Sequence, residues 1–256
     1  MPLEIITIPC LSDNYAFAAR DADSGNVTVV DVPEAAPILA ALKERGWGVS
    51  QVLITHHHPD HIDGLGALLE AHPGANVIGA AADAHRLPNL DRAVSEGDTV
   101  SIGSVAGTVM DVSGHTIGHI AYHFPDARVI FTGDSLMALG CGRVFEGTKP
   151  QMWASLAKMA ALPGDTQICS GHEYTFANGK FAQTIEPDNA DLAARMDAIT
   201  AARAAGQPTV PSLMSLELAT NPFLRAAEPS VQQHLGMEGA DPADVFAEIR
   251  TRKDNF

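Results

Sequence analysis

The chain has 256 residues, of which 46% are hydrophobic and 18% charged, the composition of a folded globular protein long enough to bury a large core. Its formal net charge of −15 opposes binding to phosphate backbones and anionic membranes, so we expect no nucleic-acid or membrane partner. The opening Met-Pro-Leu-Glu-Ile-Ile lacks the basic and apolar regions of a secretory leader. We therefore expect a cytoplasmic protein.

Strand and helix patterns alternate over the first two thirds of the chain. Apolar runs between turn residues predict strands, and apolar residues at helical spacing predict helices. In chain order, the pattern predicts strands within 3–30, a helix at 33–45, a strand at 49–55, a helix at 62–72, a strand at 76–80, strands within 93–114, a strand at 128–133, a helix at 151–161 and a strand at 167–170. This alternation indicates an α/β protein with helices packed on sheet faces.

The last third of the chain is predicted to be helical. Residues 189–205 are rich in alanine, Gly206-Gln-Pro208 ends that segment, and further helices are expected after Pro211 and Asp241. We therefore predict a catalytic domain at 1–176 and a helical C-terminal domain at 177–256. Gly64 and Gly66 fall inside a predicted helix without a third glycine, so they indicate close helix packing and not a dinucleotide site.

Metal-type side chains gather where predicted strands end. The stretch Thr55-His-His-His-Pro-Asp-His61 follows one strand, and His115, Asp134 and His172 follow three others. Because strands of one sheet bring their ends together, we expect these donors to converge at one sheet edge. The predicted ligands are His56, His58, Asp60, His61, His115, Asp134 and His172.

Seven donors are too many for one four-coordinate ion that keeps a water, so two divalent ions are implied. Zn²⁺ is the first expectation, and Fe²⁺ or Mn²⁺ suit the same donors. Asp134 can bridge the two ions, with His56, His58 and His115 on one and Asp60, His61 and His172 on the other. A hydroxide between them would be the nucleophile of a hydrolase, with Asp60 and Asp134 as the catalytic carboxylates.

The remaining histidines and cysteines have lesser expected roles. His57 alternates out of phase with its neighbours and is expected to support a ligand, whereas His119 and His123 fit packing better than support. Three cysteines without a Cys-x-x-Cys pair indicate buried thiols. The sequence contains no Gly-x-Ser-x-Gly, His-Glu-x-x-His or phosphate-loop motif. It therefore lacks the usual signatures of serine hydrolases, zincin metalloproteases and nucleotide hydrolases.

The stretch 55–61 resembles the Thr-His-x-His-x-Asp-His signature of the metallo-β-lactamase superfamily, and His115, Asp134 and His172 complete its ligand set. The segments Gly140-Cys-Gly-Arg-Val-Phe-Glu-Gly147, Gly171-His-Glu-Tyr-Thr175, Asn221-Pro-Phe-Leu-Arg225 and Arg250-Thr-Arg-Lys-Asp254 narrow the resemblance to the glyoxalase II, or hydroxyacylglutathione hydrolase, family. The resemblance implies an αββα sandwich with a helical C-terminal domain. It also implies hydrolysis of S-D-lactoylglutathione to D-lactate and glutathione in methylglyoxal detoxification.

By position, the resemblance assigns Arg143, Tyr174, Arg250 and Lys253 to the glutathione moiety, the basic groups pairing with its carboxylates. Phe145 replaces a tyrosine of some members. Three other functions remain as alternatives: a mononuclear iron persulfide dioxygenase, a tRNA-processing nuclease and a non-catalytic metal-binding module. The acidic charge disfavours the nuclease. A monomer or a weak oligomer is expected.

Overall fold

The computed structural model describes residues 2–256. Internal contacts divide the chain into two units, which are described separately. The first unit consists of the residues up to Val112 together with Ile117–Gly133. The second consists of Ser113–Thr116 and Asp134–Phe256.

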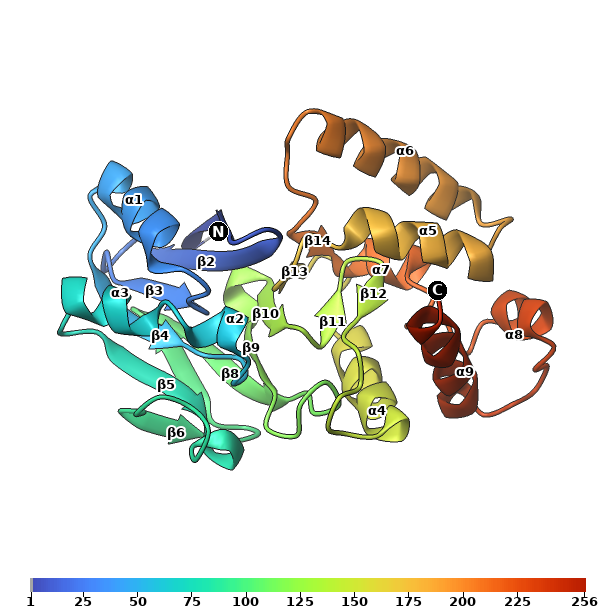
Figure 1. Ribbon diagram of the computed structural model, residues 1–256, viewed down its shortest axis with the longest axis horizontal. Coiled ribbons are helices and arrows are strands. Elements are labelled where there is room, and N and C mark those ends of the chain that lie inside the picture. Colours follow the sequence, from blue (N-terminus) through green and yellow to red (C-terminus); the bar gives the residue numbers. More distant parts are fainter. Residues whose placement is uncertain (1) are drawn as a thin grey trace. The chain divides into compact units, whose positions relative to one another are not determined.

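The first unit begins with the strands that the sequence predicts. β1 (Leu3–Cys10), β2 (Asn14–Asp21) and β3 (Val27–Val30) form an antiparallel meander, and β4 (Val49–Leu53), β5 (Asn76–Ala80) and β6 (Arg92–Val94) continue the sheet in parallel (Figure 1). The alternation of turns and apolar runs therefore located these strands correctly. A short 3₁₀ turn, η1 (Ala81–Asp83), follows β5.

Two helices of this unit pack together beside the sheet. α1 (Ala35–Arg45) ends at Gly46, whose φ of 67° permits the left-handed turn, and it contacts β1 and α3 (Leu65–Ala71). The helix predicted at 62–72 is confirmed as α3, although it begins at Leu65 instead of Ile62, and Pro59 starts a separate short helix before it, α2 (Pro59–Ile62). A Cβ on Gly64 would lie 2.7 Å from the Ala35 nitrogen, so close packing is confirmed there, whereas Gly66 has open space.

A second layer of the first unit is wholly antiparallel. β7 (Thr99–Ile102), β8 (Val105–Asp111), β9 (Ile120–Phe124) and β10 (Val129–Gly133) pair in that order, with η2 (Pro125–Ala127) between the last two. Phe17 from β2 and Phe131 from β10 meet in the core, with ring centroids 5.7 Å apart. The buried Tyr122 hydroxyl donates to the Ile54 carbonyl at 2.8 Å. These contacts join the two layers.

The expectation that all donors follow strands of one sheet is wrong. β4, which leads into the histidine stretch, pairs in parallel with β3 and β5. β8 and β10, which precede His115 and Asp134, pair antiparallel with β9 in the other layer. The donor-bearing strands of the first unit therefore belong to two layers, a distinction that strand patterns alone do not carry.

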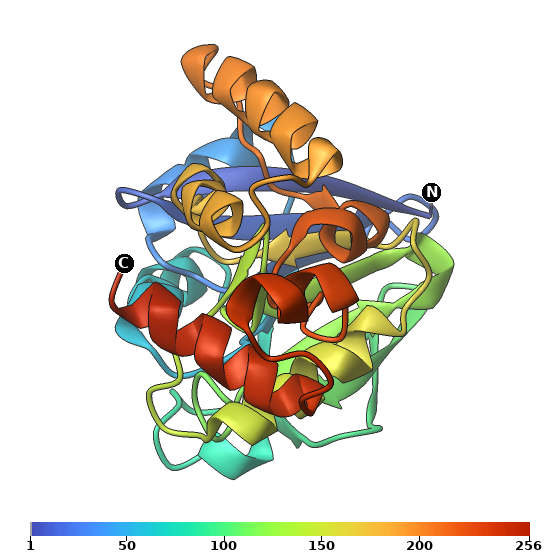
Figure 2. The ribbon, with the colours of Figure 1, turned by 90° about the vertical axis from the view of Figure 1, so that its right-hand side faces the viewer.

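The second unit is mainly helical. Its elements are the hairpin β11 (Leu136–Met137) and β12 (Gly140–Cys141), α4 (Lys149–Ala160), β13 (Gln167–Ser170), α5 (Thr175–Ile185), α6 (Ala190–Ala204), β14 (Ser212–Leu213), α7 (Met214–Thr220), α8 (Pro229–Leu235) and α9 (Pro242–Asp254). α9 packs against α4, and Figure 2 views this unit with α8 and α9 toward the reader. A capping box of Thr148 and Gln151 begins α4.

Residues 177–256 are not purely helical. β14 pairs antiparallel with β13, so that Gln167 faces Leu213 and Ile168 faces Ser212. Pro211 interrupts the helical pattern just before this strand and leaves the chain extended. No helix within residues 2–256 has both the length and the apolar character that a membrane crossing requires.

Candidate metal centre

The histidine stretch lies in the first unit, between β4 and α2. Residues 54–58 have no regular structure, and α2 then carries Asp60 and His61. His56 and His61 are fully buried, and His58 and Asp60 are half-buried. Burial of imidazoles and a carboxylate is costly unless other groups or an ion satisfy them. Their partners therefore determine what this stretch can do.

Asp31 orients His61. Its Oδ2 accepts a hydrogen bond from His61 Nδ1 at 2.8 Å, and its two oxygens also accept the Thr55 N–H and hydroxyl at 2.8 Å each. Asp31 is 3% exposed and has a φ of 54°, an uncommon backbone conformation for a residue other than glycine. With the hydrogen on Nδ1 fixed in this way, Nε2 of His61 is the nitrogen suited to a metal.

Asn14 holds the carboxylate of the stretch. Its Nδ2 donates at 3.0 Å both to the backbone carbonyl of Asp60 and to Asp60 Oδ2. Asn14 is 4% exposed and opens β2. Asn14 thus orients the Asp60 carboxylate, a group whose oxygens are natural donors to a cation.

The other histidines of the first unit surround this stretch. His56 Nδ1 lies 3.0 Å from the Thr55 hydroxyl, and the His56 ring stacks on His119 with centroids 4.6 Å apart. That stacking agrees with the packing predicted for His119. His57 Nδ1 lies 3.1 Å from Oδ2 of buried Asp83, which Arg86 also contacts.

In the second unit, Asp134 lies against two imidazoles. Its Oδ2 is 3.5 Å from His115 Nε2 and 3.2 Å from His172 Nε2. All three side chains are buried. His115 comes from the turn at 113–116, Asp134 directly follows β10, and His172 follows β13, as the sequence predicts.

A backbone carbonyl orients His115. His115 Nδ1 donates to the Arg143 carbonyl at 2.8 Å, which leaves Nε2 on the side of Asp134. Gly142 makes this approach feasible, because a Cβ there would collide with the Asp134 carbonyl oxygen. The backbone at Gly142, next to Arg143, therefore packs closely against the backbone of Asp134.

The side chains assigned to glutathione differ greatly in exposure. Arg143 is exposed, with Nε 3.6 Å from Asp254 Oδ1, and the partly exposed Tyr174 ring stacks on His172 at 4.6 Å. Phe145 is 61% exposed, with its ring 5.3 Å from that of His115. An aromatic and cationic surface thus borders the donors of this unit.

Arg250 and Lys253 of α9 are not equivalent. Arg250 is 4% exposed, and its guanidinium donates to the Cys141 carbonyl at 3.0 Å and to Asp254 at 2.9 Å. Lys253 is half-buried, with Nζ 3.4 Å from the Ala177 carbonyl. Burial and the neighbouring Arg250 charge lower the pKa of Lys253. Only Lys253 retains an accessible cationic end.

The donor chemistry fits divalent ions. All seven predicted ligands belong to groups of side chains that could hold a metal ion. Their nitrogen and oxygen atoms suit Zn²⁺, Fe²⁺ and Mn²⁺, and the Nδ1 bonds of His61 and His115 are typical of metal-bound histidine. Sequence reasoning missed Asp31, although it directly follows the strand 27–30 just as Asp134 follows β10. Asn14 and Asp83 carried no comparable signal.

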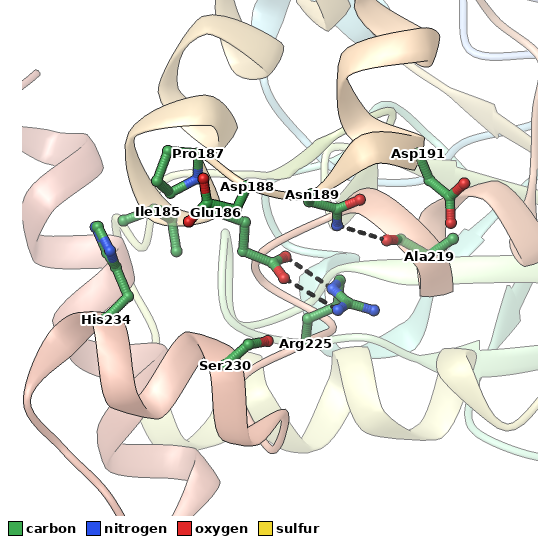
Figure 3. A pocket seen from close by; sticks show the side chains of 10 residues that line it. All are labelled: Ile185, Glu186, Pro187, Asp188, Asn189, Asp191, Ala219, Arg225, Ser230 and His234. Carbon is green, nitrogen blue, oxygen red and sulfur yellow. Dashed lines mark hydrogen bonds and ion pairs between the residues drawn. The ribbon is translucent and has the colours of Figure 1, made fainter.

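A separate cavity of about 380 Å³ lies in the second unit (Figure 3). It is lined by residues of α5 to α8 and their connections, and none of the predicted ligands lines it. Two of its lining residues, Glu186 and Arg225, form an ion pair with two hydrogen bonds, at 2.7 and 3.0 Å. We regard this cavity as distinct from the candidate metal centre.

Comparisons with known proteins place the chain in a class. Residues 20–172 match the model of the metallo-β-lactamase superfamily. The crystal structure of the BLEG-1 B3 metallo-β-lactamase shares the fold, with a TM-score of 0.67 and 20% identity over 86% of this chain and 99% of that one. The chain is therefore a metallo-β-lactamase superfamily protein, with mixed sheets, helices and a C-terminal helical region.

The family within this class is also clear. Residues 173–256 match the model named hydroxyacylglutathione hydrolase C-terminus. Proteins named hydroxyacylglutathione hydrolase from Ruegeria pomeroyi and Cereibacter sphaeroides are 64% and 63% identical to the chain, each over the whole of both sequences. The chain belongs to the hydroxyacylglutathione hydrolase family.

Proposed function

We propose that this chain hydrolyses glutathione thioesters of 2-hydroxy acids, with S-D-lactoylglutathione giving D-lactate and glutathione. The observation that carries the proposal is the full-length identity of 64% to a relative named for that reaction, in a chain whose seven predicted donors belong to groups that could hold a metal ion. The thioester carbonyl is the electrophile, and the glutathione thiolate is the leaving group. The chain's task is to bind, orient and activate these two parts.

The seven donors are proposed to hold two divalent ions, Zn²⁺ in the first instance. His56, His58 and His115 would hold one, Asp60, His61 and His172 the other, and Asp134 would bridge them. Bound there, such ions would lower the pKa of a shared water and polarise the thioester carbonyl. The Asp134 carboxylate supports the bridging role, because its Oδ2 lies within 3.5 Å of both His115 Nε2 and His172 Nε2.

The side chains behind the ligands would fix their orientation before substrate arrives. Asp31 holds His61, Asn14 holds Asp60, and the Arg143 carbonyl holds His115. Such contacts prevent the rings and carboxylates from rotating, so less reorganisation is needed during the reaction. Asp60 and Asp134 are the two carboxylates proposed to act at the reacting centre.

Arg143, Tyr174, Arg250 and Lys253 are proposed to form the glutathione site. Arg143, Tyr174 and Lys253 have exposed or partly exposed ends that can meet the ligand, with charge-assisted bonds to its carboxylates. Arg250 is buried and would act by holding Asp254, which also contacts Arg143. The division into domains 1–176 and 177–256 is likewise a proposal, supported by family models that meet at residues 172 and 173.

The deciding experiment measures thiol release from S-D-lactoylglutathione, with metal content determined on the same sample. We expect about two ions per chain and steady release of glutathione. Asp134→Ala should lose both metal and turnover, while Asp126→Ala, which removes an exposed carboxylate, should change neither. Full metal and near-normal turnover in Asp134→Ala would refute the bridged pair. Oxygen consumption without thioester hydrolysis would instead indicate a dioxygenase.

A further inference from the structure

A fully buried carboxylate lies in the second unit without a role in the proposed reaction. Glu217 of α7 is 0% exposed. It forms an ion pair with Arg195 and accepts the Ser212 hydroxyl, and its Oε2 accepts the Leu139 N–H at 2.8 Å and the Asn221 amide at 3.0 Å. A buried charge stabilises a fold poorly compared with apolar residues, so this network calls for another explanation.

The network includes hydrogen bonds to the tip of the β11–β12 hairpin. Leu139 there has a φ of 55°, a strained conformation for a residue with a side chain, and Glu217 holds its N–H. Asn221 donates to the Met137 and Gly140 carbonyls at 3.1 and 3.0 Å. Asn178 of α5 donates to the Ala138 carbonyl at 3.2 Å. Side chains of α5, of α7 and of Asn221 just after α7 therefore satisfy the backbone of four consecutive hairpin residues.

The two ends of this hairpin carry groups of the proposed centre. Asp134, the proposed bridging ligand, precedes β11, and Arg143, whose carbonyl accepts from His115, follows β12. The Gly142 N–H donates to the Ser135 carbonyl at 3.0 Å, which ties the two ends together. A shift of the hairpin would move Asp134 and the partner of His115 at once.

We propose that Glu217 and Asn221 are positioning residues, which set the hairpin so that Asp134 and the Arg143 carbonyl are placed for metal binding. This inference rests on the proposed function, because it concerns the same ligands. It assigns to α7 a role in the metal centre that none of its side chains performs by direct contact. The pair acts through backbone groups that only this hairpin conformation offers.

The test compares Asn221→Ala with a matched control, Asn189→Ala. Asn189 also makes side-chain hydrogen bonds in the second unit, to the Ala219 carbonyl and from the Leu192 N–H, but it does not touch the hairpin. Metal affinity is measured by competition with a chelator, at a temperature at which both variants remain folded. We expect Asn221→Ala to bind metal about tenfold more weakly, as for other residues that support ligands, and Asn189→Ala to match the wild type.

A second variant keeps the test decisive if Asn221→Ala does not fold. Asn178→Ala removes a single bond to the hairpin and should weaken metal binding in the same direction, by a smaller factor. Equal metal affinity in the hairpin variants and the control would overturn the inference and leave Glu217 and Asn221 as purely structural. If the wild-type chain itself bound no metal, the proposed function would fail instead, so the two failures are distinguishable.

Discussion

Asp31 and His61 are separated by thirty positions in the sequence, yet Asp31 Oδ2 and His61 Nδ1 lie 2.8 Å apart in a fully buried pair. Asp31 also accepts hydrogen bonds from the N–H and the hydroxyl of Thr55, the first residue of the histidine stretch. One carboxylate therefore fixes the start of the stretch and one of its proposed ligands.

Asp31→Asn should weaken metal binding by about 10- to 100-fold, because the amide can present only one acceptor where the carboxylate serves three donors. Chelator competition on the folded variant measures this. Asp91→Asn is a suitable control, since Asp91 accepts a backbone N–H in the same unit, at Val77, away from the histidines. Wild-type metal affinity in Asp31→Asn would contradict the orienting role.

Lys253→Ala should affect substrate binding, whereas Arg250→Ala should affect stability. Removing Lys253 should raise KM for a glutathione thioester by about tenfold, as expected for one charge-assisted contact, with little change in Tm. Removing Arg250 should lower Tm, because the Cys141 carbonyl and Asp254 lose a buried donor. Thermal melts and kinetics with two thioesters, one lacking glutathione's carboxylates, provide the measurements.

Arg252→Ala is the control for this pair, since Arg252 is exposed and its Nε forms an ion pair with Glu248 of the same helix at 2.8 Å. It should leave KM and Tm close to the wild type. If Lys253→Ala changed KM equally for both thioesters, direct recognition of a glutathione carboxylate by Lys253 would have to be abandoned.

Turnover should not depend on a cysteine. Burial raises the pKa of Cys10 and of Cys141 to about 11, and burial also raises the pKa of Cys169, so all three thiols remain protonated at neutral pH. Replacing all three by serine should preserve thioester hydrolysis while lowering Tm. Loss of hydrolysis in a folded, metal-loaded triple variant would show that a thiol takes part.

Asp21 should make stability depend on acid. The Ser104 N–H, and to a lesser extent the Ser24 hydroxyl, hold the pKa of Asp21 well below the ordinary value of an aspartate. Because the folded pKa is the lower one, this stabilisation is present above the unfolded pKa and is lost as pH falls toward the folded pKa. Asp21→Asn should therefore lower Tm at pH 7, and its difference from the wild type should shrink below about pH 4. A difference that stayed constant with pH would rule out this linkage.

Local patterns predicted much of this structure from sequence. The meander within 3–30, α1 with Gly46 and the strands before Asp134 and His172 follow from apolar periodicity and turn residues, which act over a few positions. Periodicity does not reveal which strands pair. For that reason the assignment of all donor-bearing strands to one sheet failed, and β14 was missed.

The proposed ligands were easier to find than the residues behind them. Histidine and aspartate at strand ends have a recognisable chemistry, whereas Asn14, Asp83 and Glu217 are ordinary polar residues until their partners are known. Arg250 illustrates the same limit. The family resemblance assigned it, with Lys253, to the glutathione moiety, but its burial and its ion pair with Asp254 depend on packing that the sequence does not display.

The hairpin that links Asp134 to Arg143 also restricts how such a chain can be redesigned. A proposed metal ligand and a proposed substrate contact stand at its two ends, and Gly142 leaves no room for a side chain beside the Asp134 carbonyl. Lengthening the loop to admit a bulkier acyl group would therefore disturb the metal centre as well. Changes of specificity are better introduced at exposed positions such as Phe145, whose side chain can vary while the backbone of the hairpin stays intact.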